Sequence, residues 1–269
     1  MEYMRKTILR VAGAQMEALQ GAHELLNIER WFFLAKKERA DIIVFPEQFF
    51  QKRITKKTYR ENDVAYAKNI FSHLSRKFAV WSVMGSAAEK AGSKFFNRSY
   101  LLNSNGNIEG FYDKVFLNGE ERDWKTPGDK FPVFPTPWGK IGIMVCRDLL
   151  YPKAAMRLAE NGAQVIFCPA YWSCYSEDYP STYRQYVKKG MPAKEVDALV
   201  PARAFENGVG VVFVNGAGEN KKEILLGKSQ VAVPFFGRTK RLEHNKEELL
   251  VAEIDLKSIA DAKKGYGFS

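Results

Sequence analysis

Histidine is scarce in this chain of 269 residues, which contains only His23, His73 and His244. The first two fall in stretches with amphipathic helical spacing and the third in the charged turn EHNKEE, so none follows an apolar strand. A cysteine nucleophile that relies on a histidine base is therefore not expected, and neither is a histidine-rich metal site.

Cysteine is equally scarce, with Cys146, Cys168 and Cys174 as the whole complement. Their spacing is not typical of metal ligands or of a disulfide framework, and a low, odd number suits a reducing compartment. Nor does any stretch approach the roughly 20 apolar residues of a membrane-spanning helix. The N-terminal sequence MEYMRKTILRVAGAQ lacks the apolar centre of a signal peptide. We therefore expect a cytoplasmic protein without a membrane partner.

Acidic residues are outnumbered, with 31 Asp and Glu against 41 Lys and Arg and a net charge of +10. The densest basic runs, at 36–39, 56–60 and 219–223, are scattered, and no basic strand interleaved with aromatic residues of the RNA-binding kind is visible. We interpret them as solvated surface and expect no nucleic-acid partner. The alternative left open is a non-catalytic module that uses its positive charge to bind an acidic partner.

Hydrophobic periodicity predicts alternating strands and helices in the first part of the chain and hairpins further along. Apolar residues recur every three or four positions in the predicted helices, and short apolar runs mark the strands. The predicted helices are 22–39, 58–78, a helix opened by Pro152 and ended by Gly162, and 194–207. The predicted strands and hairpins are 7–16, 41–47, 81–87, 97–114, 133–146, 163–169, 209–218, 228–235, 238–243 and 249–256. With no repeat and no linker, we expect one α/β domain over residues 1–269, built on a mixed sheet or on two sheets.

Three reactive side chains each follow an apolar strand. Glu47 ends DIIVFPE, Lys114 ends GFYDK, and Cys146 follows IGIMV and precedes Arg147 and Asp148. Ligands of α/β sheets bind at the carboxyl ends of strands, so these positions suit a site. Taken singly, each also has a structural interpretation: a helix cap, a solvated charge and a small buried hydrophobic residue.

Seven segments, in order along nearly the whole chain, resemble the nitrilase superfamily of carbon–nitrogen hydrolases. They are VAGAQM, ADIIVFPE, YDKVFLNGEERDWKTPG, GKIGIMVCRDLLYP, RLAENGAQVIFCPAYW, ARAFENGVGVVFVNGAG and GKSQVAVPFFG. The resemblance implies an α-β-β-α sandwich of two mixed sheets with helices outside. It also implies a homodimer or a higher homo-oligomer.

The resemblance further implies the roles of individual residues. Glu47 would be the general base, Lys114 the oxyanion stabiliser and Cys146 the nucleophile. A second family glutamate commonly follows the lysine by seven positions, which is Glu121 here. The Arg147 backbone N–H would complete the oxyanion site. The proposed chemistry needs no metal and no organic cofactor.

The chain departs from the family pattern at two positions that bear on the substrate. Phe116 stands where the family commonly has histidine, and Arg147 stands where an aromatic or acidic residue is common. Arg147 could bind a substrate carboxylate with two hydrogen bonds, or could instead pair with a neighbouring acid such as Asp148. Tyr171 and Trp172 follow another apolar strand and could form the pocket wall, a lid or part of the core.

The expected reaction is hydrolysis of a non-peptide C–N bond in a small linear amide through a thioester. The alternatives are an N-carbamoyl amine or amino-acid amidohydrolase and a true nitrilase. The expected partner is thus a small amide, carbamoyl compound or nitrile. The loops that shape the pocket, and with them the substrate, do not follow from the sequence.

Overall fold

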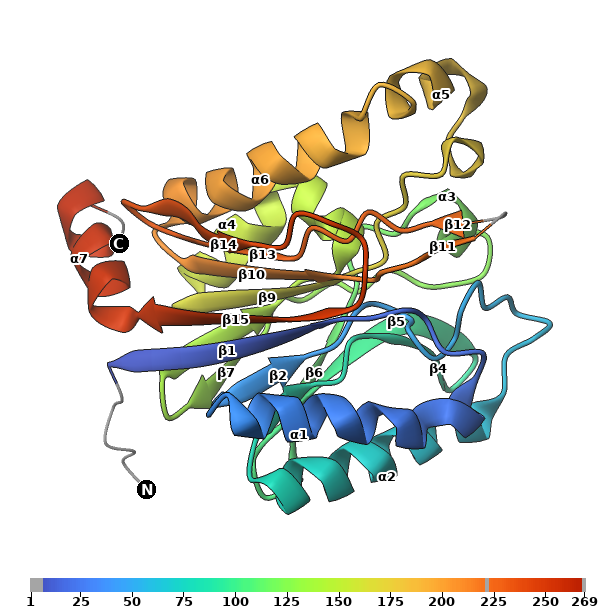
Figure 1. Cartoon of the computed structure of the whole chain (residues 1–269), viewed down its shortest axis with the longest axis horizontal. Coiled ribbons are helices and arrows are strands. Elements are labelled where there is room, and N and C mark those ends of the chain that lie inside the picture. The colour runs from blue at the N-terminus through green and yellow to red at the C-terminus, as the bar shows by residue number, and fades with distance from the viewer. Residues whose placement is uncertain (1–6, 221–222, 268–269) are drawn as a thin grey trace.

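The computed structural model describes residues 7–220 and 223–267, so Lys221 and Lys222 of the basic run 219–223 lie outside the described residues. Two β-sheets lie face to face with helices on both outer faces (Figure 1). Helices α1 (Glu29–Lys37) and α2 (Glu61–Phe78) cover one sheet, and α4 (Pro152–Glu160) and α6 (Met191–Asn207) cover the other. The predicted α-β-β-α sandwich is confirmed.

The first sheet contains seven strands and mixes parallel with antiparallel pairs. Its strands are β1 (Ile8–Gln15), β2 (Ile42–Val44), β3 (Trp81–Val83), β4 (Ala87–Ala91), β5 (Lys94–Leu102), β6 (Ile108–Asp113) and β15 (Glu248–Asp255). The order is β15-β1-β2-β3-β5-β4, with β6 paired to β5. The central strands β1, β2 and β3 run parallel, so their carboxyl ends meet at one edge.

The second sheet has six strands in the order β14-β13-β10-β9-β8-β7. Its strands are β7 (Val133–Thr136), β8 (Gly139–Ile143), β9 (Val165–Ala170), β10 (Gly210–Asn215), β13 (Gln230–Val233) and β14 (Gly237–Arg241). Strands β8, β9 and β10 are parallel, and all residues of β9 and β10 are buried, as expected for strands covered on both faces. A separate two-stranded pair joins β11 (Glu219–Asn220) to β12 (Glu223–Ile224).

Alternation along the strands divides the apolar residues into three layers. Ile42 and Val44 of β2 point into the layer between the sheets, whereas Ile43 packs on the outer layer beneath α1 and α2. In that outer layer Phe71 of α2 lies edge-on to Phe45, with ring centroids 4.9 Å apart. A third apolar layer lies between the second sheet and α4 and α6.

Several predicted elements differ from those observed. Residues 22–28 of the predicted helix 22–39 form a 3₁₀ helix, and predicted strand 81–87 ends at Val83, as β4 begins at Ala87. The hairpin of β5 and β6 turns at Gly106, whose φ is 80°, as its sequence predicts. The sequence interpretation missed the β4–β5 hairpin, the 3₁₀ helix Ser176–Asp178 and the helices α3 (Gly119–Arg122), α5 (Ser181–Val187) and α7 (Leu256–Tyr266).

The carboxyl ends of the parallel strands in both sheets meet at one end of the sandwich. The backbone N–H of Glu47, beyond β2, donates to the carbonyl of Ala170, the last residue of β9, at 3.3 Å. This bond joins the two sheets where the predicted site residues emerge.

Candidate active site

Glu47 lies at the seam between the sheets and is 4% exposed. Its Oε1 accepts hydrogen bonds from Lys114 Nζ and Asn97 Nδ2, both at 2.8 Å. Its Oε2 accepts the backbone N–H of Tyr171 at 3.2 Å. These donors fix the orientation of the carboxylate.

Lys114 follows β6 and is held by its backbone on both sides. Its N–H donates to Asn97 and its carbonyl accepts from Gly128, each at 2.9 Å. The ammonium lies 2.8 Å from Glu47 Oε1 and 2.8 Å from Glu121 Oε2. Burial opposes its charge, but the two carboxylates outweigh burial and raise the pKa of Lys114 well above its ordinary value.

Glu121 is fixed by the short helix α3. The Asn118 side chain accepts the Glu121 backbone N–H at 2.8 Å, and Glu121 Oε2 accepts the Asn118 N–H at 3.1 Å, which forms a capping box. Glu121 Oε1 accepts from Asn97, Lys125 and Gln48. Burial disfavours the carboxylate, but Lys114 and Lys125 outweigh it and lower the pKa of Glu121.

Cys146 begins the 3₁₀ turn Cys146–Leu150 that follows β8. Its φ is 47°, in the left-handed region that side chains with a Cβ seldom adopt. Burial and the Glu47 carboxylate raise the pKa of its thiol well above the ordinary value, while Lys114 and the Tyr171 N–H act in the opposite direction. At rest the sulfur therefore carries its proton.

Asp148 is wholly buried, although it is a charged residue that follows Arg147 at the end of an apolar strand. Its carboxylate accepts three hydrogen bonds of 2.8 Å, from the N–H groups of Val145 and Phe116 and from the Tyr112 hydroxyl. Burial raises the pKa of Asp148 to about 6, because it outweighs these donors. The carboxylate links the Cys146 turn to the segment after Lys114.

Arg147 leaves this cluster and extends toward Tyr151. Its Nη2 lies 3.4 Å from the Tyr151 hydroxyl, and the Tyr151 ring stacks on Phe116 at 3.9 Å between centroids. Within the described part of the chain Arg147 forms no ion pair, so the predicted alternative of pairing with Asp148 is not observed.

Tyr171 and Trp172 separate in the structure. The Tyr171 N–H binds Glu47, and its hydroxyl donates to the buried Glu223, which also pairs with Lys52 and Arg53. Trp172 is 6% exposed and packs edge-on against Phe213. Tyr171 thus touches the cluster directly, whereas Trp172 contributes to the layer beneath α6.

The structure brings the predicted residues Glu47, Lys114, Glu121 and Cys146 together. It also places in the same cluster residues that the sequence did not indicate. Asn97, Lys125 and Asp148 were not predicted as site residues. Asp148 could have been suspected, since it lies two residues after Cys146, whereas nothing near Asn97 or Lys125 in the sequence indicates that they meet Glu121.

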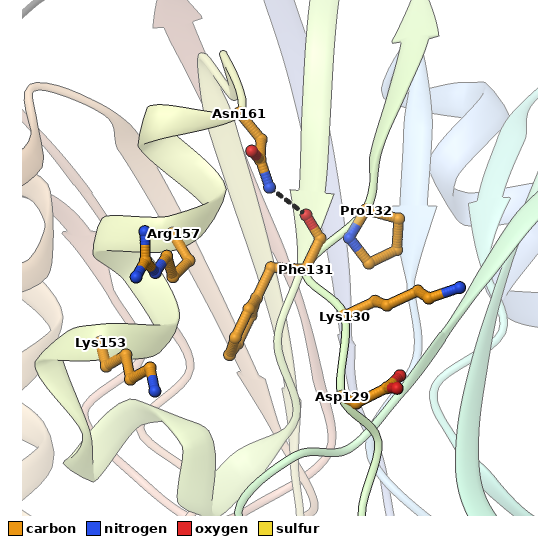
Figure 2. Close-up of a pocket in the computed structure, with 7 residues that line it drawn as sticks. All are labelled: Asp129, Lys130, Phe131, Pro132, Lys153, Arg157 and Asn161. Carbon is orange, nitrogen blue, oxygen red and sulfur yellow. Dashed lines mark hydrogen bonds between the residues drawn. The ribbon is translucent and has the colours of Figure 1, made fainter.

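A surface pocket of about 560 Å³ lies elsewhere, between α4 and residues 129–132 (Figure 2). Asn161 donates to the Phe131 carbonyl at 2.7 Å on its rim, and Lys153 and Arg157 come from α4. It contains none of the clustered residues.

Across residues 7–220 and 223–267, no group of three or more His, Cys, Asp or Glu is arranged to hold a metal ion. No helix in those ranges is both long and apolar enough to cross a bilayer.

Three relatives carry names that point to different substrates. A nitrilase of Pyrococcus abyssi is 30% identical over 262 residues, which are 93% of this chain and 90% of that protein. An omega-amidase of Xenopus laevis, NIT2-B, is 25% identical over 86% of this chain and 82% of its own length. An N-carbamoylputrescine amidase of Solanum tuberosum is 28% identical over 66% of this chain and 61% of its own length.

A solved carbon-nitrogen hydrolase from Helicobacter pylori has the same fold. Its TM-score is 0.85 at 23% identity, and the match covers 97% of this chain and 94% of that one. The sequence model of the family described as carbon-nitrogen hydrolase matches residues 8–264. The chain therefore belongs to the carbon-nitrogen hydrolase family of the nitrilase superfamily and is a hydrolase of that class.

Proposed function

We propose that this hydrolase cleaves a small linear amide through a thioester on Cys146, with Glu47, Lys114 and Glu121 as its catalytic partners. The observation that carries the proposal is the 2.8 Å contact of Lys114 Nζ with Glu47 Oε1, beside a thiol whose pKa responds to both groups. A base, a cation and a nucleophile at one buried point are the groups that acyl transfer needs.

Because the resting thiol is protonated, proton transfer accompanies attack. Glu47 accepts the S–H proton as the sulfur bonds to the amide carbon, and the carbonyl π electrons move to oxygen. The Lys114 ammonium and the Arg147 N–H stabilise that oxyanion, an effect for which one donor is typically worth about 3–4 kcal/mol. Collapse breaks the C–N bond, and Glu47 returns the proton to the departing nitrogen. Glu47 then takes a proton from water as the water oxygen bonds to the thioester carbon. The C–S bond breaks, and Glu47 returns the proton to the sulfur, so that the acid is released and the thiol is restored.

The N-carbamoyl amine alternative gains support from one residue, Glu195 of α6. Burial raises the pKa of its carboxylate, and it forms no ion pair within the described part of the chain. Burial is the main cause of the raised pKa of Tyr179, and the charges of Glu195 and Cys146 raise it further. The carboxylate and the thiol therefore both lie near the Tyr179 side chain. A carboxylate without a cation so placed would suit a substrate that ends in an ammonium group.

The test uses intact-protein mass spectrometry after brief incubation with amides, N-carbamoyl amines with and without a terminal ammonium group, and nitriles. Wild type is compared with Cys146→Ala, and ammonia release is followed in parallel. An acyl adduct on wild type alone, with ammonia from amides, supports the main proposal. Turnover confined to cationic carbamoyl compounds, and lost in Glu195→Gln, supports the alternative. Amide hydrolysis that persists in Cys146→Ala contradicts the mechanism.

We also propose a single domain and a homodimer or larger homo-oligomer. Phe236 is 69% exposed, and its neighbour Phe235 packs on the exposed Tyr266 at 5.2 Å between centroids. Such apolar side chains commonly mark contacts between subunits. Sedimentation equilibrium of wild type and Phe236→Glu tests this, and a monomeric wild type contradicts it.

A further inference from the structure

Lys125 is a second buried ammonium beside the cluster. Its side chain is 1% exposed, and its Nζ lies 3.0 Å from Glu121 Oε1 and 4.9 Å from the centre of the Trp124 ring. Burial lowers the pKa of Lys125, and Glu121 only partly offsets it. A buried lysine is unfavourable unless it is paired, so its presence here needs an explanation.

The ion-paired group of Glu47, Lys114 and Glu121 becomes neutral only when Lys125 is counted. Glu47 and Glu121 are the two buried carboxylates that form ion pairs with Lys114. One ammonium would face two carboxylates, and Lys125 supplies the second positive charge on the far oxygen of Glu121. Proton transfer from the thiol to Glu47 leaves this sum unchanged, because the sulfur gains the charge that Glu47 loses.

We infer that Lys125 is a positioning residue that neutralises Glu121, so that the Lys114 ammonium can act on the Cys146 sulfur and on the substrate oxyanion. This inference rests on the proposed function for its catalytic meaning. The two oxygens of the Glu121 carboxylate have different partners, which supports this inference: Oε2 contacts Lys114 and Oε1 contacts Lys125. Without Lys125, Lys114 alone would compensate Glu121 and would attract the thiolate less strongly.

Other charged groups in the cluster act on the same atoms and must be kept constant. Lys114 and Glu47 act on Lys125 in addition to Glu121, and Glu47 and Lys114 act on Cys146. Tyr179 also lies within the electrostatic reach of Cys146, and the buried Asp148, whose pKa is about 6, interacts with Lys114. A decisive experiment therefore changes Lys125 and Glu121 alone.

The test is the rate at which iodoacetamide alkylates Cys146 as a function of pH, measured by mass spectrometry of the Cys146 peptide. In Lys125→Met the midpoint should move to higher pH, with a rate at neutral pH about tenfold below wild type, which corresponds to one pH unit. Lys125→Arg keeps the charge and should keep the wild-type midpoint. In Glu121→Gln/Lys125→Met both charges of the pair are removed, and the midpoint should return toward wild type. The exposed Lys37→Met is the matched control.

A folded Lys125→Met with the wild-type midpoint overturns the inference and leaves Lys125 as a structural ion pair. A double variant with a midpoint as high as that of Lys125→Met also overturns it, since compensation of Glu121 would then not be the cause. If Lys125→Met fails to fold, Lys125→Gln replaces it, because glutamine can still donate to Glu121. Alkylation of Cys146 requires no turnover, so this experiment tests the role of Lys125 independently of the proposed reaction. Amide hydrolysis by Cys146→Ala would contradict the proposed function and would leave the alkylation result unaffected.

Discussion

The backbone N–H of Phe116 donates to the Asp148 carboxylate at 2.8 Å, and this bond fastens the segment after Lys114 to the turn that holds Cys146. The same carboxylate accepts the Val145 N–H on the nucleophile side. One buried side chain thereby sets the spacing between the thiol and the ammonium.

Replacing Asp148 with alanine should destabilise the protein and lower turnover. Two buried donors and one half-buried donor would lose their acceptor, so we expect a loss of about 3 kcal/mol in the free energy of unfolding, with a lower kcat. Urea unfolding and steady-state kinetics measure the two effects. Asp148→Asn, which retains one acceptor oxygen, should lose less. A change below about 0.5 kcal/mol in the alanine variant would contradict the role assigned to Asp148.

The raised pKa of Asp148 predicts a defined dependence of stability on pH. The folded protein binds this proton with a pKa of about 6, above the ordinary value of 3.8, so protonation favours the folded state. The contribution is complete below pH 3.8 and is lost as pH rises through about 6. Over that range it amounts to about 3 kcal/mol. The free energy of unfolding in urea should be measured for wild type and for Asp148→Asn from pH 4 to 7. The difference between the two proteins should show this decline, and a difference that does not change with pH would refute the prediction.

Gly128→Ala should disturb Lys114 through its backbone. A Cβ at Gly128 would lie 2.2 Å from the carbonyl oxygen of Asp113, and the Gly128 N–H binds the Lys114 carbonyl. We expect a loss of about 1–3 kcal/mol in stability together with a reduced kcat. Gly119→Ala, where the Cβ meets nothing within 4 Å, is the control. Equal stability of the two variants in thermal melts would show that the crowding is relieved at no cost.

Tyr171→Phe should preserve most of the catalytic rate. The group of Tyr171 that binds Glu47 is its backbone N–H, which the substitution retains. Loss of the hydroxyl removes one donor to the buried Glu223, for which we expect about 1 kcal/mol in stability. Kinetics and urea unfolding test both statements. A large fall in kcat with unchanged KM would place the hydroxyl itself in the chemistry.

Sequence patterns predicted an α/β domain with a mixed sheet or two sheets, because its parallel strands are continuous apolar runs and its helices have regular spacing. The α-β-β-α sandwich itself was implied by the resemblance to the nitrilase superfamily. Helix α7 was missed although Asp255 caps it and Leu256, Ile259 and Ala262 form its buried face. The predicted strand 249–256 extends to the first residue of this helix, so the sequence contains no separate signal for its start. The parts of the site that depend on distant contacts were beyond prediction. Asn97 lies near the start of β5 with no sign of a role, yet its amide bridges Glu47 and Glu121.

The position of the site at the seam has a consequence for folding. Glu47 and Lys114 follow strands of the first sheet, and Cys146 follows a strand of the second, so neither sheet alone contains a complete site. The altered reactivity of the thiol can arise only when the two sheets have docked. The time course of Cys146 protection during refolding would therefore report on that docking step, separately from the formation of either sheet.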